Sequence, residues 1–205
     1  MVEALLEEFE GEKVHLVGHS LGGSTAAYAA RNWPDRIASV TLYEPVLFGL
    51  LAQENHPAAA EGHLIASVVH GYLRLGQPEQ AARSFVDFWS GEGAFDAADE
   101  HTRDYITRTV DRVGDDWSGT LPDLPGQLWL RDCAGFEMPV QVLKGAQTRV
   151  STSAIADLLA DAIPGAAMHV VPNVDHMGPV MRPDLINPLI VRFLDDVTER
   201  ATQMA

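Results

Sequence analysis

The sequence is poor in cysteine and in positive charge. The single cysteine, Cys133, has no partner among the 205 residues, so no internal disulfide can form. Lysine and arginine total 14 against 29 aspartate and glutamate residues, which gives a formal net charge of −15. Such a charge opposes binding to nucleic acid phosphates or to anionic lipid surfaces. We therefore expect a cytoplasmic protein that does not bind nucleic acid.

Long apolar runs and an export signal are also missing. The longest apolar stretch, residues 46–52, is far shorter than the roughly 20 residues that a membrane-spanning helix needs. Residues 1–12 form an acidic amphipathic pattern, whereas a signal peptide begins with a basic region. Apolar residues make up 46% and charged residues 21% of the chain, which is typical of globular proteins. These features predict a globular domain without a membrane segment.

Strand and helix patterns alternate along much of the chain. Residues 20–33 are rich in alanine and end before Pro34, and helical periodicity returns in residues 155–162 and 183–199. Short apolar runs predict strands at residues 14–17, 37–43, 139–143 and 168–171, the first of them buried. This order predicts an α/β fold with a doubly wound, mostly parallel sheet.

The middle of the chain has helical periodicity. Between residues 48 and 136, apolar side chains recur three and four positions apart, which predicts a helical insertion. His56, His63 and His70 are spaced seven residues apart, and about 10.5 Å separates successive members on a helix, too far to share one metal ion. No other ligand cluster is visible, so we expect neither a metal nor a cofactor.

A serine motif lies between the first predicted strand and the following helix. Gly18-His19-Ser20-Leu21-Gly22 matches G-x-S-x-G in the strand-to-helix context that this nucleophile motif requires. The two glycines allow a tight turn that presents the Ser20 hydroxyl, and the Leu21 N–H can stabilise an oxyanion at the start of the helix. The alternative is that Ser20 only caps the helix. We expect His19 to have a packing role.

With Gly23 included, the motif resembles that of cap-bearing serine hydrolases of the α/β-hydrolase superfamily. The resemblance implies a hydrolase core at residues 1–48 and 137–205 and a helical cap at residues 49–136. By the same likeness, the four predicted strands are the fifth to eighth of the family, so the chain resembles the carboxyl-terminal part of that fold without the second oxyanion donor. The exposed edge of the first strand then predicts a homodimer or aggregation.

The resemblance also suggests the partners of Ser20. His176 follows the last predicted strand, where the family keeps its general base, and an imidazole with an ordinary pKa of about 6.5 suits proton transfer near neutrality. The family usually places an aspartate after its seventh strand, but Thr148 lies there. Some members take the acid from the end of the sixth strand, which corresponds to Glu44. A structural role for Glu44 is the alternative, and Asp175 is a weaker candidate for the acid.

These residues predict a serine hydrolase that cleaves an ester-like small molecule through an acyl-enzyme at Ser20. Two alternatives are a cofactor-independent haloperoxidase or perhydrolase, which would share the same residues, and a non-catalytic remnant or ligand-binding module. Aromatic side chains in the helical insertion could line an acyl pocket or could only pack its helices. They are Phe85, Phe88, Trp89, Phe95 and Trp117.

Overall fold

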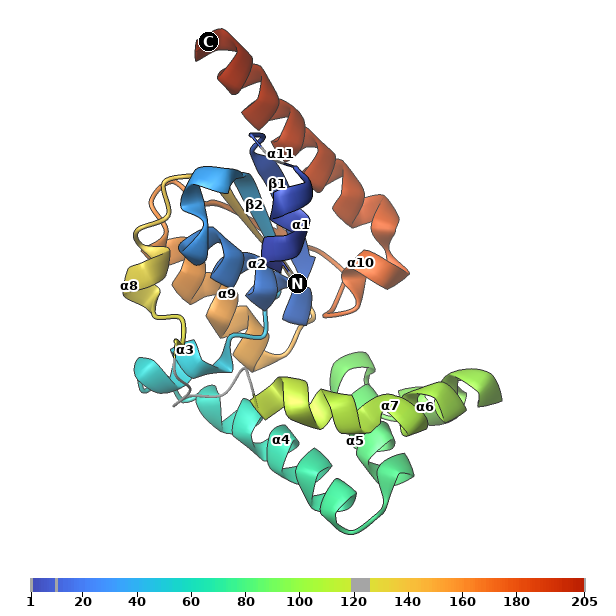
Figure 1. Ribbon diagram of the computed structural model, residues 1–205. Helices are drawn as coiled ribbons and strands as arrows, with labels where there is room; N and C mark the ends of the chain where they lie inside the picture. Colours follow the sequence, from blue (N-terminus) through green and yellow to red (C-terminus); the bar gives the residue numbers. More distant parts are fainter. Residues whose placement is uncertain (1, 10, 119–125, 205) are drawn as a thin grey trace. The chain divides into compact units, whose positions relative to one another are not determined.

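The chain folds into two units. The computed structural model describes residues 2–9, 11–118 and 126–204, with the side chains of residues 115–118 and 204 left out. The first unit combines Met1–Val46, Leu128–Thr148 and Thr152–Ala205, and the second combines Leu47–Gln127 and Arg149–Ser151. Figure 1 shows the sheet in the first unit and a group of helices in the second.

A parallel sheet forms the centre of the first unit. Its strands follow the chain order β1 (Val14–His19), β2 (Ile37–Tyr43), β3 (Val140–Gly145) and β4 (Ala167–Val171). In the part of the chain that the structure describes, each strand pairs in parallel with the next, with His19 opposite Tyr43 and Gly145 opposite Val171. The predicted α/β fold with a mostly parallel sheet is therefore confirmed.

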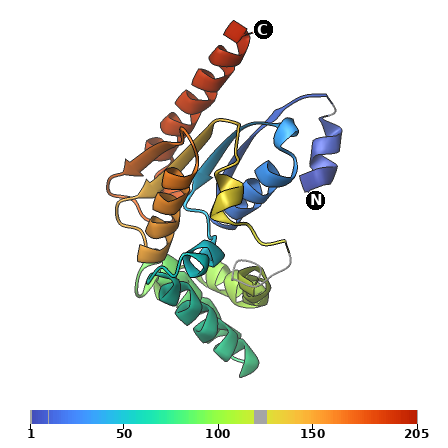
Figure 2. The ribbon, with the colours of Figure 1, turned by 90° about the vertical axis from the view of Figure 1, so that its left-hand side faces the viewer.

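Helices cover both faces of this sheet. Because strand order follows chain order, right-handed crossovers place α2 (Leu21–Asn32) and α9 (Val150–Ala162) on the same face. Figure 2 shows α11 (Pro183–Met204, red) on the other face. The remaining helical elements of this unit are short: α1 (Val2–Glu8), the 3₁₀ helix η1 (Pro34–Arg36), α8 (Leu130–Cys133) and α10 (Gly178–Met181).

The carboxyl ends of the strands are held against α11 by apolar packing. Tyr43, Leu143 and Val171 alternate with side chains on the opposite face and form a buried cluster with Val174 and Ile186. Leu185, Leu189 and Ile190 of α11 pack around this cluster. Burying such side chains stabilises the fold by about 1.5–3 kcal/mol each, so the strand ends form a firm base for the loops that follow them.

The single thiol lies at the end of α8. Cys133 is fully buried, and burial followed by the charge of Asp132 raises the pKa of its thiol to about 12. It therefore remains a protonated, apolar core group near neutral pH.

The burial predicted for the first strand is wrong. Val14 and Leu16 are only partly buried, and Val17 is 52% exposed. The physical reason is that β1 is an edge strand of the described sheet, so its side chains are not covered by a neighbouring strand and its helices.

The second unit is helical. It contains α3 (Phe48–Gln53), α4 (Ala59–Arg74), α5 (Pro78–Ser90), α6 (Ala94–Ala97) and α7 (Glu100–Ser118). Helix α5 packs against α4, α6 and α7. Pro78 starts α5, where its missing N–H costs nothing, and Gly62 of α4 leaves room for the Phe48 ring.

Candidate active site

Ser20 occupies a sharp turn between β1 and α2. Its backbone has φ 55° and ψ −121°, a conformation that side-chain-bearing residues rarely adopt, and its N–H donates to the Tyr43 carbonyl at 3.0 Å. A Cβ added to Gly18 would overlap the backbone of Gly22, so only glycine fits there. The local sequence thus forces Ser20 into a strained turn at the carboxyl end of the sheet.

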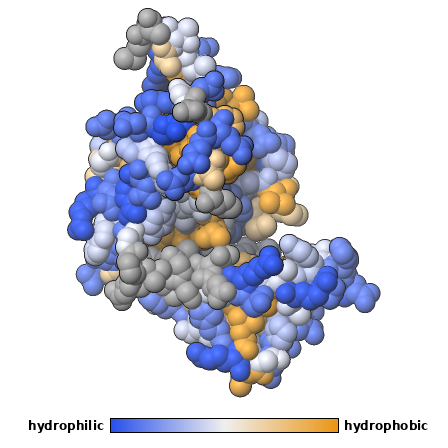
Figure 3. All heavy atoms as spheres, viewed as in Figure 1, coloured by the Kyte–Doolittle hydropathy of each residue, from blue (hydrophilic) through white to orange (hydrophobic). Residues whose placement is uncertain are grey.

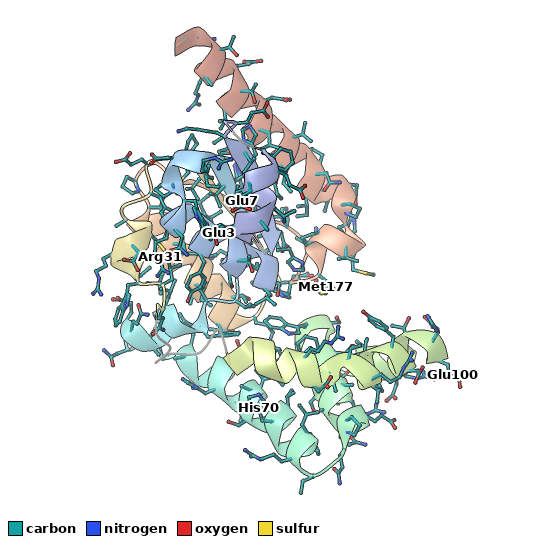
Figure 4. All side chains as sticks on the ribbon, viewed as in Figure 1. Glu3, Glu7, Arg31, His70, Glu100 and Met177 are labelled. Carbon is teal, nitrogen blue, oxygen red and sulfur yellow. The ribbon has the colours of Figure 1, made fainter. Side chains whose placement is uncertain are left out.

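His176 lies in the loop between β4 and α10, beside Met177, which is labelled in Figure 4. Its side chain is only 3% exposed. Its Nε2 lies 3.0 Å from Ser20 Oγ, and its Nδ1 lies 2.8 Å from Glu44 Oε2. The structure therefore brings together three side chains that are 24 and 132 residues apart in the sequence.

Glu44 directly follows β2 and is completely buried. Its positive φ of 43° turns the chain at the strand end, and Oε1 accepts a hydrogen bond from the Gly145 N–H at 2.7 Å. Oε2 accepts a second hydrogen bond from Thr148 Oγ1 at 2.5 Å, in addition to its contact with His176. Hydrogen bonds to a carboxylate stabilise its charged form and compensate for its removal from water.

The hydrogen bonds define how the imidazole can act. A carboxylate only accepts, so Nδ1 of His176 carries the proton that is donated to Glu44. In the neutral ring Nε2 is then an acceptor, which faces the Ser20 hydroxyl. This arrangement can take a proton from the serine and hold the resulting imidazolium beside a buried carboxylate.

Thr148 follows β3, where the resemblance led us to expect an aspartate. Its hydroxyl binds the carboxylate of Glu44, which follows the neighbouring strand β2. Its hydroxyl lies 3.0 Å from Thr152 Oγ1, so that Glu44, Thr148 and Thr152 form a short chain of hydrogen bonds. Asp175 makes a different contact: its Oδ1 accepts from the Met177 N–H at 2.9 Å and so turns its own loop.

Two side chains that the sequence did not reveal hold the same loop. His19 Nε2 lies 2.8 Å from the His176 carbonyl oxygen, and the two imidazole centroids are 4.8 Å apart. Tyr43 donates its hydroxyl to the Asp175 carbonyl at 2.7 Å. No motif or periodicity in the sequence marks these contacts, which join residues 157 and 132 positions apart.

Burial shifts the pKa of both side chains in opposite directions. Burial, and then repulsion from His176, lowers the pKa of His19 below its ordinary value. Burial, and then the charges of Glu44 and Asp175, raises the pKa of Tyr43. Near neutral pH, His19 is therefore uncharged and Tyr43 keeps its proton.

The remaining predicted site residues lie on two different units. Leu21 is the first residue of α2, where backbone N–H groups lack partners within the helix. The predicted acyl contacts Phe85, Phe88 and Trp89 lie on α5, and Phe95 lies on α6. Trp89 and Phe95 are buried, and Phe88 stacks edge-on against Trp89. The side chain of Trp117 lies outside the described residues, and a role in substrate contact stays a prediction for all five.

The three spaced histidines are separate. His56 Nδ1 accepts from the Ala58 N–H, and His70 Nε2 donates to the Gly114 carbonyl, while His63 is exposed. Among the residues that the structure describes, no three histidine, cysteine, aspartate or glutamate side chains are grouped so that they could hold a metal ion. In the same part of the chain, every helix is too short or too polar to cross a membrane.

A parallel sheet with a serine after β1, a carboxylate after β2 and a histidine after β4 defines the α/β-hydrolase fold. The chain belongs to the alpha/beta hydrolase family, whose family model matches residues 1–189. It is 27% identical over 199 residues to the dihydrolipoyllysine-residue acetyltransferase component of the acetoin cleaving system of Cupriavidus necator, a match that covers 94% of this chain and 49% of that protein.

Two further matches agree with this family. Mouse monoacylglycerol lipase ABHD6 is 24% identical over 208 residues, which covers 89% of this chain and 55% of the lipase. A crystal structure of bromoperoxidase from Bacillus anthracis superimposes with a TM-score of 0.69 at 22% identity, over 95% of this chain and 71% of that structure. The chain thus spans about half the length of the curated relatives that it matches.

Proposed function

We propose that this protein is a serine hydrolase that cleaves an ester or a related acyl compound through an acyl-enzyme at Ser20. The observation that carries this proposal is the continuous line of hydrogen bonds from Ser20 Oγ through His176 to Glu44, at 3.0 and 2.8 Å. Such a line activates a hydroxyl that is a weak nucleophile by itself. The similarity to a monoacylglycerol lipase, whose name states an ester substrate, agrees with it.

In the first half-reaction, Ser20 Oγ attacks the carbonyl carbon of the substrate while its proton passes to His176 Nε2. The carbonyl oxygen becomes an oxyanion, which the Leu21 N–H at the start of α2 stabilises. Glu44 stabilises the imidazolium and keeps its ring in position. The oxyanion then collapses, the bond to the leaving alcohol breaks, and the alcohol takes the proton from His176.

Water completes the second half-reaction. His176 takes a proton from a water molecule, whose oxygen forms a bond to the acyl carbon. Collapse of the second oxyanion releases the carboxylic acid and returns the proton to Ser20 Oγ. The net reaction consumes one water and needs neither a metal nor a redox cofactor in any step.

A fluorophosphonate probe, which reacts with activated serines, tests the proposal. We expect the wild-type chain to be labelled and the Ser20→Ala variant to be unlabelled, with hydrolysis of a p-nitrophenyl ester lost in parallel. Ser24→Ala is the matched control, because Ser24 is a nearby serine in the first turns of α2, and its hydroxyl donates to the Ser20 carbonyl at 3.4 Å. Absence of labelling in the wild type, with native secondary structure by circular dichroism, would favour a non-catalytic binding module.

A second assay separates hydrolysis from the haloperoxidase alternative. The same preparation is supplied with acetate, hydrogen peroxide and bromide, and bromination of a dye is compared with ester cleavage. We expect ester cleavage to dominate by catalytic efficiency. Bromination that exceeded ester cleavage would instead assign perhydrolysis as the main reaction.

A further inference from the structure

The loop that carries His176 is fixed by side chains from the ends of two neighbouring strands. Tyr43, the last residue of β2, donates its hydroxyl to the Asp175 carbonyl at 2.7 Å. His19, the last residue of β1, lies with Nε2 2.8 Å from the His176 carbonyl oxygen. Because a carbonyl only accepts, Nε2 of His19 is the donor. Two successive carbonyls are therefore bound from two different strands.

The third neighbouring strand adds a main-chain contact to the same loop. Gln147, two residues after β3, donates its N–H to the Val174 carbonyl at 2.9 Å. Gly145 at the end of β3 lies so close to this carbonyl that a Cβ there would overlap it. The main chain on either side of the imidazole is thus restrained by donors that the rigid sheet positions.

Ring packing limits the movement of the imidazole further. The His19 and His176 rings are tilted by 48°, with centroids 4.8 Å apart, and the His19 ring meets the Tyr43 ring edge-on at 5.6 Å. Edge-on ring contacts of this kind favour a fixed relative orientation of the two rings. His19 therefore contacts both the loop and the other anchoring residue.

The protonation states of the two residues suit this arrangement. The charged or titratable groups that act on His19 are His176 and Glu44, and those that act on Tyr43 are Glu44 and Asp175. The raised pKa of Tyr43 keeps its hydroxyl a donor, and the lowered pKa of His19 keeps that ring neutral near pH 7. A neutral His19 adds no positive charge beside the imidazolium that His176 becomes when it takes the serine proton.

We propose that His19 and Tyr43 are positioning residues, which hold the main chain of Asp175 and His176 so that the imidazole stays in reach of both Ser20 and Glu44. Their effect on turnover rests on the proposed hydrolase function. Their effect on the His176 ring does not, because it follows from the hydrogen bonds alone.

Three variants test the proposal by their kinetics. Tyr43→Phe and His19→Leu remove one donor each, and we expect kcat to fall about 10- to 100-fold because a misplacement near 1 Å has effects of that order. KM should change less than about threefold, since neither residue is assigned to substrate binding. His19→Gln places an N–H near the position of Nε2, so it should restore kcat to within about fivefold of the wild type.

Two control variants make the same chemical changes elsewhere. His15→Gln alters another histidine of β1, whose Nδ1 lies 2.7 Å from Ser39 Oγ, and Tyr105→Phe alters an exposed tyrosine of α7. Both should retain the wild-type kcat. Equal losses in His19→Gln and His19→Leu, or a wild-type kcat in both Tyr43→Phe and His19→Leu, would overturn the proposal.

Nuclear magnetic resonance of the histidine ring nitrogens gives a second readout that needs no activity. In the wild type, His176 should be the tautomer with the proton on Nδ1, and in Tyr43→Phe and His19→Leu the two tautomers should exchange. An unchanged His176 spectrum in both variants would refute the positioning role. If the wild type fails to react with the fluorophosphonate, the proposed function fails, but the ring spectra still decide the role of His19 and Tyr43. If His19→Leu does not fold, Tyr43→Phe, which loses a single oxygen atom, carries the test.

Discussion

Replacing Glu44 with glutamine changes one charge without changing the shape of the side chain. The wild-type carboxylate accepts three hydrogen bonds, from the Gly145 N–H, the Thr148 hydroxyl and His176 Nδ1. A carboxamide has only one oxygen, so it can accept on only one side. If that oxygen keeps the bond to Gly145, the amide N–H₂ group faces His176 and Thr148.

The consequence for His176 follows from the tautomer. An amide N–H facing Nδ1 requires Nδ1 to accept, which moves the ring proton to Nε2 and leaves no acceptor for the Ser20 proton. Loss of the acid by this change of tautomer lowers turnover about 10⁴-fold in serine proteases. That factor corresponds to about 5.4 kcal/mol, at 1.36 kcal/mol for each tenfold. We expect a loss of the same order here.

Steady-state hydrolysis of a p-nitrophenyl ester measures this loss. Asp175→Asn is the matched control, because it makes the same change of carboxylate to carboxamide one residue from His176, and its Oδ1 can still accept from the Met177 N–H. The control should lose less than about tenfold in kcat. A Glu44→Gln variant that remained within tenfold of the wild type, or a control that lost as much, would show that Glu44 is not the acid.

Three further predictions concern the surroundings of the site and the sheet edge. Thr148→Val removes the 2.5 Å hydrogen bond to Glu44 and should lower kcat/KM about tenfold, since a hydrogen bond to a charged group contributes about 1.5–3 kcal/mol. Thr148→Ser keeps the hydroxyl and should retain the wild-type kcat/KM. Equal kcat/KM values for the two variants would contradict this prediction. Because folding lowers the pKa of His19, the unfolded chain binds more protons than the folded chain below about pH 6.5. The free energy of unfolding should therefore fall as the pH drops through that value. Urea unfolding at pH 7 and pH 5 measures this fall, which should be smaller in His19→Gln. Val17 is 52% exposed on edge strand β1, and Figure 3 shows hydrophobic surface beside β1 and α11. We therefore expect the wild type to associate in size exclusion and Val17→Lys to shift it toward the 22.3 kDa monomer. A stable wild-type monomer would refute this.

Much of the first unit could be predicted from local patterns. Strand β2 has the bounds expected for it, Ile37–Tyr43, because Pro34 and Pro45 punctuate the chain on either side. Strand β1 continues two residues beyond its apolar run to His19, since Gly18 and His19 keep their pairing with Leu42 and Tyr43. Neighbouring strands decide that extension, and local composition carries no signal for it.

Only part of the candidate site could likewise be predicted from the sequence. Ser20 could be found because the G-x-S-x-G motif lies between a predicted strand and a predicted helix, and His176 and Glu44 because the family resemblance implies a base and an acid after the corresponding strands. The roles of His19, Tyr43 and Thr148 depend on which loop packs beside which strand end. Those contacts join residues more than 100 positions apart, and neither periodicity nor a motif describes them.

The buried thiol of Cys133 leaves the rest of the chain without a competing reactive sulfur. With a pKa of about 12 and no exposure, it will not compete for alkylating reagents near neutral pH. In a Ser20→Cys variant, the thiol at position 20 would therefore be the single thiol that iodoacetamide alkylates. The pH dependence of that alkylation would follow the ionisation of this thiol as the neighbouring imidazole influences it, without any substrate and without removing the native sulfur.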